Sequence, residues 1–419
     1  MSRLSRLEAT AVLSWLTQRH GVAIGRVALC DAGPAGIGVA ASSGAAAEDI
    51  LLAIPRMVWS PFSAATARLT LPPSVPVAVD AQAASLGGGS HFADAVLLAG
   101  TIANAEASPE HAPYLSMLPS PDVPLLWPSP LRVALLQGSS AEPAAQQQAV
   151  LSNAFHNTLA SALAAAAGPP PPTLLAFKRA QALLLSRAHS GAGKPFALVP
   201  GLDLLNHGGS RASADVNFDE ASGEFRLVAR RPHEQGEEVT IDYGSDASHR
   251  LLRLYGFLAA EAGDAAAVAN SALDEPGAPI SGEEVSLSLV PAELADASEA
   301  SREAWRQHRA ALAACGLHGS TMRLRVDATG AVPLALASAD STGDASAADT
   351  ALLVLSAAID AQLERQSNGL AASAAVEQAE AAPADFRDRA RLARRLHLRE
   401  RAVLLAAEAE TQRRLRSHR

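Results

Sequence analysis

The stretch that decides the fold runs from Leu198 to Leu258. It opens with LVPGLDLLNHGG, continues after a Gly/Asp-rich spacer with FRLVARRPHEQGEEVTIDYG, and closes with SHRLLRLYGFL. The apolar run at 198–205 is typical of a buried segment, and the Asn206–His207 pair that follows it needs hydrogen-bond partners once it is buried. We therefore expect a buried segment whose polar end is satisfied by the surrounding chain.

The middle of this stretch predicts two strands joined by a turn. Apolar and polar residues alternate from 225 to 230 and again from 239 to 243, which is the period of a strand. Residues 233–236 supply the turn. Ser248 can then cap a short helix that ends at Gly256.

Two scarce side chains flank this predicted helix. Tyr243 and Tyr255 are two of only three tyrosines in the chain, so their proximity in sequence points to a chemical role.

Composition limits the classes of protein that this chain can represent. A net charge of −9 over 419 residues gives no global reason to expect nucleic-acid binding. The two cysteines, Cys30 and Cys315, can form neither a disulfide framework nor a CxxC zinc cluster, so we predict no metal site and a reducing compartment. The longest apolar stretches are shorter than the roughly 20 residues that span a bilayer, which predicts no membrane association.

The N-terminus goes directly into a helical pattern. MSRLSRLEATAVLSWL has neither the apolar core of a signal peptide nor a long Ser/Arg-rich transit segment. A cytoplasmic or nuclear location is therefore expected, and a plastid location would require an incomplete N-terminus.

The Asn-His pair, the GEEVTIDYG strand and the YGF ending together resemble the C-terminal half of a SET domain. More narrowly, they resemble the RuBisCO large-subunit methyltransferase-like protein lysine methyltransferases, which include an actin-histidine methyltransferase. In that family the Asn-His segment and the chain after the catalytic tyrosine form a pseudoknot around S-adenosylmethionine. The resemblance therefore implies S-adenosylmethionine as the cofactor.

The resemblance also implies roles for individual residues. Tyr243 is expected to be the catalytic tyrosine at the methyl-transfer pore. Arg187 lies at the end of a helical segment with Phe177, Ala180 and Leu184 on one face, and it matches the arginine that reaches the cofactor's carboxylate. The remaining cofactor contacts are expected at Ala35, Gly36, Ile37, Gly38, Asn206, His207, Tyr255 and Phe257.

The expected substrate residues are His189, Asp203 and Tyr255, and two of them carry open alternatives. Asp203 either meets the substrate or caps a turn. His189 stands where lysine-modifying relatives have an aromatic residue and the histidine-modifying relative has an amide. Ala35, where relatives often have an acidic residue, and Gly191, in place of a second arginine, are further departures.

The implied fold is α+β: a SET domain, which is a β-clip with a C-terminal pseudoknot, over residues 1–260. A helical insertion is expected at about 61–182, and an all-α substrate-binding domain at 265–419. Tyr114, at the start of the family's YxxxLP element, is expected to pack in the core.

The expected activity is methyl transfer from S-adenosylmethionine to a lysine nitrogen of a protein substrate, held by the C-terminal helices of a monomer. The alternatives are a protein-histidine methyltransferase and a catalytically silent SET scaffold that binds a partner protein. Nucleic-acid binding through the arginines at 394–401 ranks last because the chain is acidic.

Overall fold

The computed structural model describes residues 6–24, 26–32, 37–105, 111–118, 121–191, 193–244, 247–258, 283–290, 298–315, 317–327, 331–334, 345–379 and 381–417. The chain divides into two compact units. The first contains residues 1–126, 147–245 and 254–256, and the second contains residues 127–146, 246–253 and 257–419.

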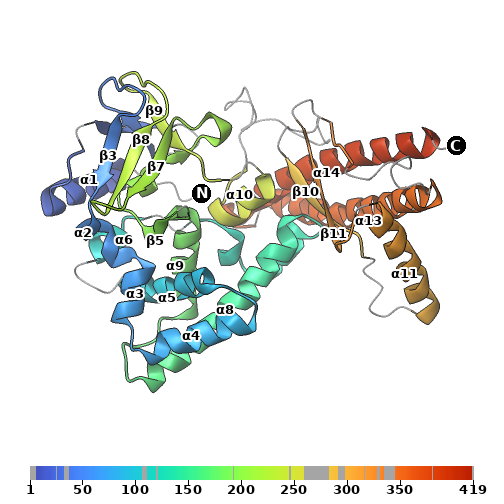
Figure 1. The fold of residues 1–419 in the computed structure, drawn as a ribbon, viewed down its shortest axis with the longest axis horizontal. Coiled ribbons are helices and arrows are strands. Elements are labelled where there is room, and N and C mark those ends of the chain that lie inside the picture. Colours follow the sequence, from blue (N-terminus) through green and yellow to red (C-terminus); the bar gives the residue numbers. More distant parts are fainter. Residues whose placement is uncertain are drawn as a thin grey trace. The chain divides into compact units, whose positions relative to one another are not determined.

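The described strands of the first unit form three small sheets, which Figure 1 shows on one side of this unit. The first sheet has the order β1-β2-β9-β6, the second β3-β8-β7, and the third is the hairpin β4-β5. Their bounds are β1 Val27–Asp31, β2 Ile37–Ala41, β3 Ile50–Ile54, β4 Ala188–Gly191, β5 Lys194–Leu198, β6 Asn206–His207, β7 Ala214–Asp219, β8 Glu224–Ala229 and β9 Glu238–Ile241.

Strand β9 joins distant parts of the chain because it lies between β2 and β6. It pairs antiparallel with β2, through Val39 and Val239, and parallel with β6, through Asn206 and Thr240. The N-terminal strands and the Asn-His segment are therefore held together by the strand that leads to Tyr243.

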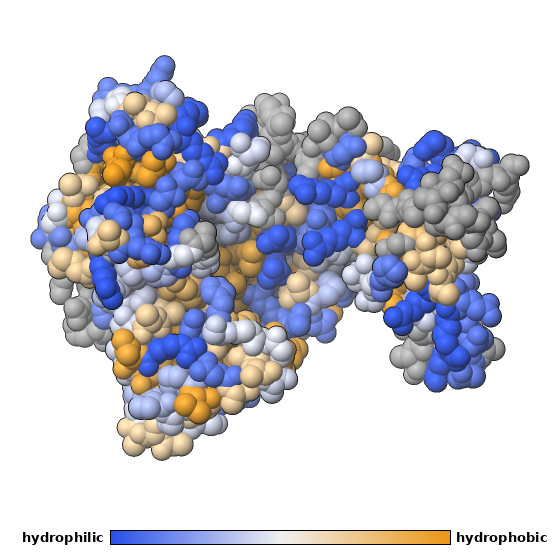
Figure 2. All heavy atoms as spheres, viewed as in Figure 1, coloured by the Kyte–Doolittle hydropathy of each residue, from blue (hydrophilic) through white to orange (hydrophobic). Residues whose placement is uncertain are grey.

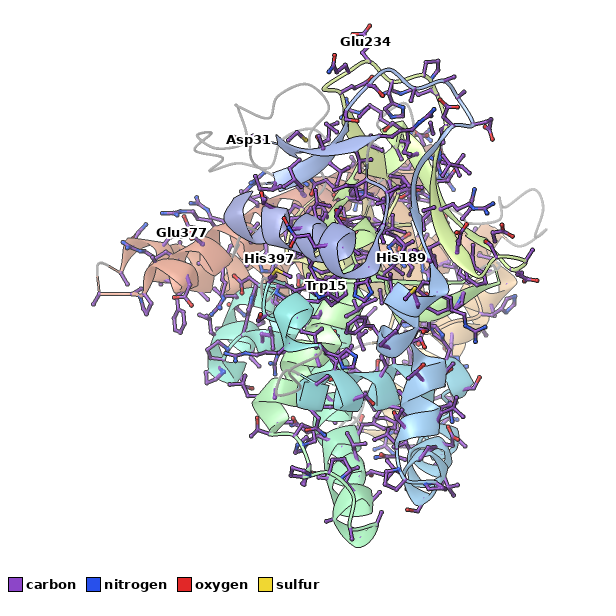
Figure 3. The ribbon with its side chains drawn as sticks, turned by 90° about the vertical axis from the view of Figure 1, so that its left-hand side faces the viewer. Trp15, Asp31, His189, Glu234, Glu377 and His397 are labelled. Carbon is purple, nitrogen blue, oxygen red and sulfur yellow. The ribbon has the colours of Figure 1, made fainter. Side chains whose placement is uncertain are left out.

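The predicted strand-turn-strand is confirmed in β8 and β9. Between them, the backbone N–H of Glu237 donates to the carbonyl of Glu234 at 3.2 Å, and Gly236 takes a positive φ of 83°. Figure 3 shows Glu234 at the outer tip of this turn. The alternation of residues in β8 places Phe225, Leu227 and Ala229 in the core, where each is fully buried.

The apolar run before the Asn-His pair is buried as expected. Val199, Leu202, Leu204 and Leu205 belong to the core cluster that the strands share with helix α1 (Arg6–His20). Trp15 extends from α1 (Figure 3) and stacks on the ring of Tyr114 at 5.6 Å.

The predicted helical insertion is present. Its helices in the first unit are α3 Ala64–Thr70, α4 Ser74–Ser85, α5 Ser90–Ala105, α6 Ala112–Leu115, α9 Leu174–Arg187 and most of α8, which spans Ala141–Ala165; α2 (Arg56–Trp59) precedes them. They share a core that includes Phe155 and Phe177. Thr173 caps α9 by accepting from the backbone N–H of Ala176 at 3.2 Å. Figure 1 shows α3, α5 and α9 gathered below the strands of this unit.

The observed units differ from the predicted boundaries in two respects. Residues 246–253 and 257–260, expected at the end of the SET domain, group with the C-terminal residues. Residues 127–146, expected within the insertion, also group with the C-terminal residues. The reason for residues 127–146 is hydrophobic packing: Trp127, Leu135 and Leu136 share a buried cluster with Ala393 and Leu396 of α14 (Ala384–Ser417).

The second unit is mainly helical but is not all-α. Its helices are α7 Ser129–Leu136, α10 Ser248–Tyr255 (in which residues 254–255 group with the first unit), α11 Glu299–Ala314, α13 Ala345–Gln378 and α14 Ala384–Ser417. The antiparallel pair β10 (Glu284–Ser288) and β11 (Thr321–Arg325) corrects the all-helical expectation. This pair forms because Val285, Leu287 and Leu324 point into the core on alternate positions. Among the described residues, no helix combines the length and apolarity needed to cross a membrane.

Candidate functional site

A cavity of about 260 Å³ lies in the first unit, where α9, the β4-β5 hairpin, β7 and the segment after β9 meet. It brings together five predicted site residues: Arg187, His189, Asp203, Tyr243 and Tyr255. Their positions in the sequence span 69 residues, from 187 to 255, so only the fold gathers them.

Hydrogen bonds from both its backbone N–H and its hydroxyl fix the position of Tyr243. The hydroxyl donates to the carbonyl oxygen of Leu205 at 2.6 Å, and the backbone N–H donates to Nδ1 of His207 at 3.1 Å. The rings of His207 and Tyr255 lie 5.0 and 4.5 Å from the Tyr243 ring. Burial raises the pKa of Tyr243 well above its ordinary value, so the hydroxyl stays protonated at neutral pH.

Tyr255 supports Tyr243 from the end of α10. Its hydroxyl donates to the backbone carbonyl of Tyr243 at 3.1 Å. Because Gly256 follows with a positive φ of 80°, the helix ends at the predicted residue. The pair of tyrosines thus forms one wall of the cavity.

Arg187 is the last residue of α9 and carries an unpaired donor. One Nη1 hydrogen is donated to the backbone carbonyl of Asp203. The Nε atom is buried without a hydrogen-bond partner among the described residues. A buried guanidinium N–H without an acceptor is costly, so its position at the cavity favours an external acceptor such as a carboxylate.

Asp203 has both carboxylate oxygens engaged within the fold. One oxygen accepts from the Tyr114 hydroxyl at 2.5 Å, and the other accepts from the backbone N–H of Gly201 at 2.8 Å. Burial raises the pKa of Asp203, while the charge of Arg187 and the bond from Tyr114 act against this shift. Of the two alternatives, the geometry favours the turn-capping role. Tyr114 is fully buried as expected, and it links the insertion to this turn.

Asn206 contacts the strand that runs beside it. Its side-chain amide donates to Oε1 of Glu238 at 2.8 Å. A Cβ added at Gly38 would lie 2.6 Å from that Glu238 oxygen and 2.7 Å from the Asn206 amide nitrogen. Glycine at position 38 is therefore required by this pair of side chains. The cofactor contacts predicted for Ile37, Gly38, Asn206 and His207 remain predictions.

Three other predicted positions are not placed at the cavity. Ala35 and Gly36 lie outside the described residues. Phe257 is half-buried and belongs to the second unit, so its predicted cofactor contact stays a prediction.

His189 extends from β4 and lines the cavity; Figure 3 labels it within the first unit. Its ring centroid lies 6.1 Å from that of Phe225. Burial, with a smaller contribution from the charge of Lys194, lowers its pKa to about 4. The imidazole is therefore neutral at physiological pH and can both donate and accept a hydrogen bond. Gly191, two residues later, adopts a φ of +81° next to the hairpin turn.

The lining residues that did not stand out in the sequence include Lys194, Leu205 and Asp215. Leu205 contributes through its backbone carbonyl, which no side-chain pattern can indicate. Asp215 lies in the Gly/Asp-rich spacer, where no element was predicted and where the structure has β7. Lys194 could have been noticed, since it is one of only two lysines in the chain.

The comparisons with known proteins agree with this fold. No family model matches the chain. N-lysine methyltransferase SETD6 of Mus musculus is 24% identical over 240 residues, covering 53% of this chain and 48% of that protein. The Bos taurus protein of the same name is 25% identical over 264 residues, covering 58% and 56%. The chain thus spans about half the length of the curated relatives it matches.

The solved structures cover nearly the whole chain. The SET domain of LSMT bound to lysine and AdoHcy has a TM-score of 0.62 at 17% identity, over 98% of this chain and 92% of that one. Rubisco LSMT bound to AdoMet has a TM-score of 0.61 at 16% identity, over 98% and 93%. The predicted fold class is therefore confirmed: the chain has the SET fold of the RuBisCO large-subunit methyltransferase type.

Proposed function

We propose that this protein is an S-adenosylmethionine-dependent protein-lysine N-methyltransferase. The curated relatives carry the name N-lysine methyltransferase. The similar solved structures are bound to AdoMet, to lysine and AdoHcy, or to sinefungin and monomethyllysine. One observation in this chain carries the proposal: Tyr243 lines the same cavity as Arg187, whose buried Nε has no hydrogen-bond partner among the described residues.

The residues present fit this cofactor. Its amino-acid end carries a carboxylate, which is the acceptor that the unpaired Arg187 Nε lacks. Asn206 and His207, which form β6 next to β9, would contact the rest of the cofactor. When bound, the cofactor supplies an electrophilic methyl group on a sulfonium.

The chain's own residues mainly position the acceptor. Methyl transfer needs donor, methyl group and nucleophile nearly in line, and fixing such a geometry can provide roughly 7–11 kcal/mol of the barrier. The proton of the Tyr243 hydroxyl is directed to Leu205, so the oxygen's lone pairs remain available to orient an amine N–H or to contact a polarised methyl group. Each such weak contact contributes about 0.5–1 kcal/mol, so positioning dominates.

Tyr243 is not the base that deprotonates the acceptor. A base must take up a proton, and burial raises the pKa of this phenol so that it already carries one. A lysine amine has a pKa of about 10.4 in solution, so the cavity has to favour its neutral form by other means.

Histidine is a second candidate acceptor because of His189. A neutral imidazole in the wall can donate one hydrogen bond to, or accept one from, an incoming imidazole, whereas an aromatic ring of phenylalanine could do neither. The second unit is proposed to hold the protein substrate. Helix α11 supports this because nearly all of its described side chains from 301 to 310 are exposed, and Figure 2 shows a hydrophilic surface there.

The proposal is tested by incubating the protein and a whole-cell lysate with labelled S-adenosylmethionine and locating the modified residue by mass spectrometry. Methyl-lysine that depends on intact Tyr243 is the expected result. Methyl-histidine would instead establish the second acceptor. No incorporation, together with no calorimetric binding of S-adenosylhomocysteine, would leave a catalytically silent scaffold.

A further inference from the structure

Lysine is nearly absent from this chain. Lysine and arginine together number 34, and only Lys178 and Lys194 among them are lysines. One of these two lies in the wall of the cavity that contains Tyr243 and His189. In a chain that uses arginine almost everywhere else, a lysine at this position draws attention to the charge that it places in the cavity wall.

Lys194 is placed by the hairpin that also carries His189. It is the first residue of β5 and pairs with Gly191, while His189 pairs with Ala197 on the same two strands. Its side chain is half-buried, and no hydrogen bond or ion pair to its ammonium is present within the described ranges. The charge of Lys194 helps to lower the pKa of His189. Its electrostatic effect therefore extends to the residue that is expected to line the acceptor site.

Burial lowers the pKa of Lys194, and the charge of Asp215 acts against this shift. Asp215 on β7 also lines the cavity, but Arg230 binds both of its carboxylate oxygens, at 2.8 and 2.6 Å. Glu220 lies near the backbone of Gly193, beyond the hairpin turn. The other charged groups of the cavity are Arg187, Asp203 and Asp242.

We propose that Lys194 is the resident cation of the acceptor site and keeps the incoming nitrogen in its neutral, nucleophilic form. This inference rests on the proposed methyl transfer. A positive charge beside a basic nitrogen disfavours protonation of that nitrogen, and desolvation acts in the same direction. His189 shows the effect within the structure, since burial and the charge of Lys194 both lower its pKa.

The chemistry balances without a protein base. The acceptor ammonium releases its proton to solvent before it enters, and Lys194 opposes its return. The neutral nitrogen then forms a bond to the methyl carbon as the sulfur–carbon bond breaks. The products are a methylated ammonium and a neutral thioether. Lys194 is thus a positioning residue that sets the protonation state of the acceptor.

The test is the pH dependence of methyl transfer in the full chain. Initial rates of label incorporation from saturating S-adenosylmethionine into whole-lysate protein are measured between pH 6 and 10. In K194M the midpoint of the rising limb should move up by about one pH unit, with an approximately tenfold lower rate on that limb and the wild-type rate on the high-pH plateau. K194R, which keeps the charge, should restore the midpoint.

The other lysine provides a matched control. K178M removes the same charge from α9, outside the cavity, and should leave the midpoint unchanged. Thermal unfolding and S-adenosylhomocysteine binding should be alike in all variants. A K194M profile lowered equally at every pH, or a K194R midpoint that follows K194M, would overturn the assignment. Absence of incorporation and of cofactor binding in the wild type would instead overturn the proposed function and this inference with it.

Discussion

The hydroxyl of Tyr243 donates a hydrogen bond of 2.6 Å to the backbone carbonyl of Leu205. This bond joins Tyr243, two residues after the end of β9, to the residue before β6, and both line the cavity. It fixes the phenol's orientation through a main-chain atom, so the arrangement is independent of the Leu205 side chain.

Replacing Tyr243 by phenylalanine should lower turnover by roughly 10²–10³, which is the usual loss for one preorganised polar group. Affinity for S-adenosylhomocysteine should stay within about twofold, because the ring and its packing against His207 and Tyr255 are kept. Single-turnover rates and calorimetry measure the two quantities. Y255F is the matched control: it loses the 3.1 Å bond to the Tyr243 carbonyl and keeps the Tyr243 hydroxyl, so a loss of about tenfold or less is expected. Full activity of Y243F would remove this hydroxyl from the mechanism.

Replacing Arg187 by methionine should weaken cofactor affinity by about tenfold to a hundredfold, since a hydrogen bond to a charged group contributes roughly 1.5–3 kcal/mol. R187K should recover little of the lost affinity. The guanidinium donates from Nη1 to the Asp203 carbonyl and has a second donor, Nε, at a different position, whereas a single ammonium cannot occupy both positions. Titration calorimetry with S-adenosylhomocysteine measures the change. R179M, on an exposed position of the same helix, serves as the control, and equal affinities for R179M and R187M would contradict the assignment.

Replacing Gly256 by alanine should destabilise the protein more than the same change at Gly236. Both glycines have a positive φ, 80° and 83°, which costs an L-residue about 1–2 kcal/mol. A Cβ at position 256 would also lie 2.6 Å from the backbone oxygen of Asp122, whereas nothing lies within 4 Å at position 236. Such a backbone clash adds about 1–3 kcal/mol. Urea unfolding of both variants checks the prediction, and equal losses would show that the backbone at 256 relaxes freely.

Glu400 should make the second unit less stable as the pH rises. The buried carboxylate accepts from the backbone N–H of Ser140 and from Gln366, at 3.0 Å each. Burial raises its pKa from the ordinary value of 4.5 to about 8. Because the folded-state pKa is the higher one, the stability that this group contributes is complete below about pH 4.5 and is lost as the pH rises to about 8.

E400Q removes this ionisation, so its melting temperature should vary less than that of the wild type between pH 5 and 9. The difference corresponds to a few kcal/mol, on the order of what several pKa units represent. Scanning calorimetry across this range measures it. E364Q, at an exposed position of α13, should behave as the wild type does. Parallel curves for E400Q and the wild type would show that Glu400 does not titrate within this window.

Local patterns in the sequence predicted the local elements. Alternation predicted β8 and β9, and the spacing of Phe177, Ala180 and Leu184 predicted the buried face of α9. These predictions are correct because the periodicity of a strand or a helix depends on residues that are close together in the sequence.

The sequence by itself thus determined the SET elements and most of the polar groups of the site. Only the tertiary structure decided that Tyr114 would hold Asp203 from 89 positions away, that residues 127–146 would join the second unit, and that Lys194 would line the cavity. Each of these results depends on which buried surfaces meet after the elements have formed. Hydrophobic burial is non-directional, so a local pattern shows that a residue will be buried but not which partner it will meet.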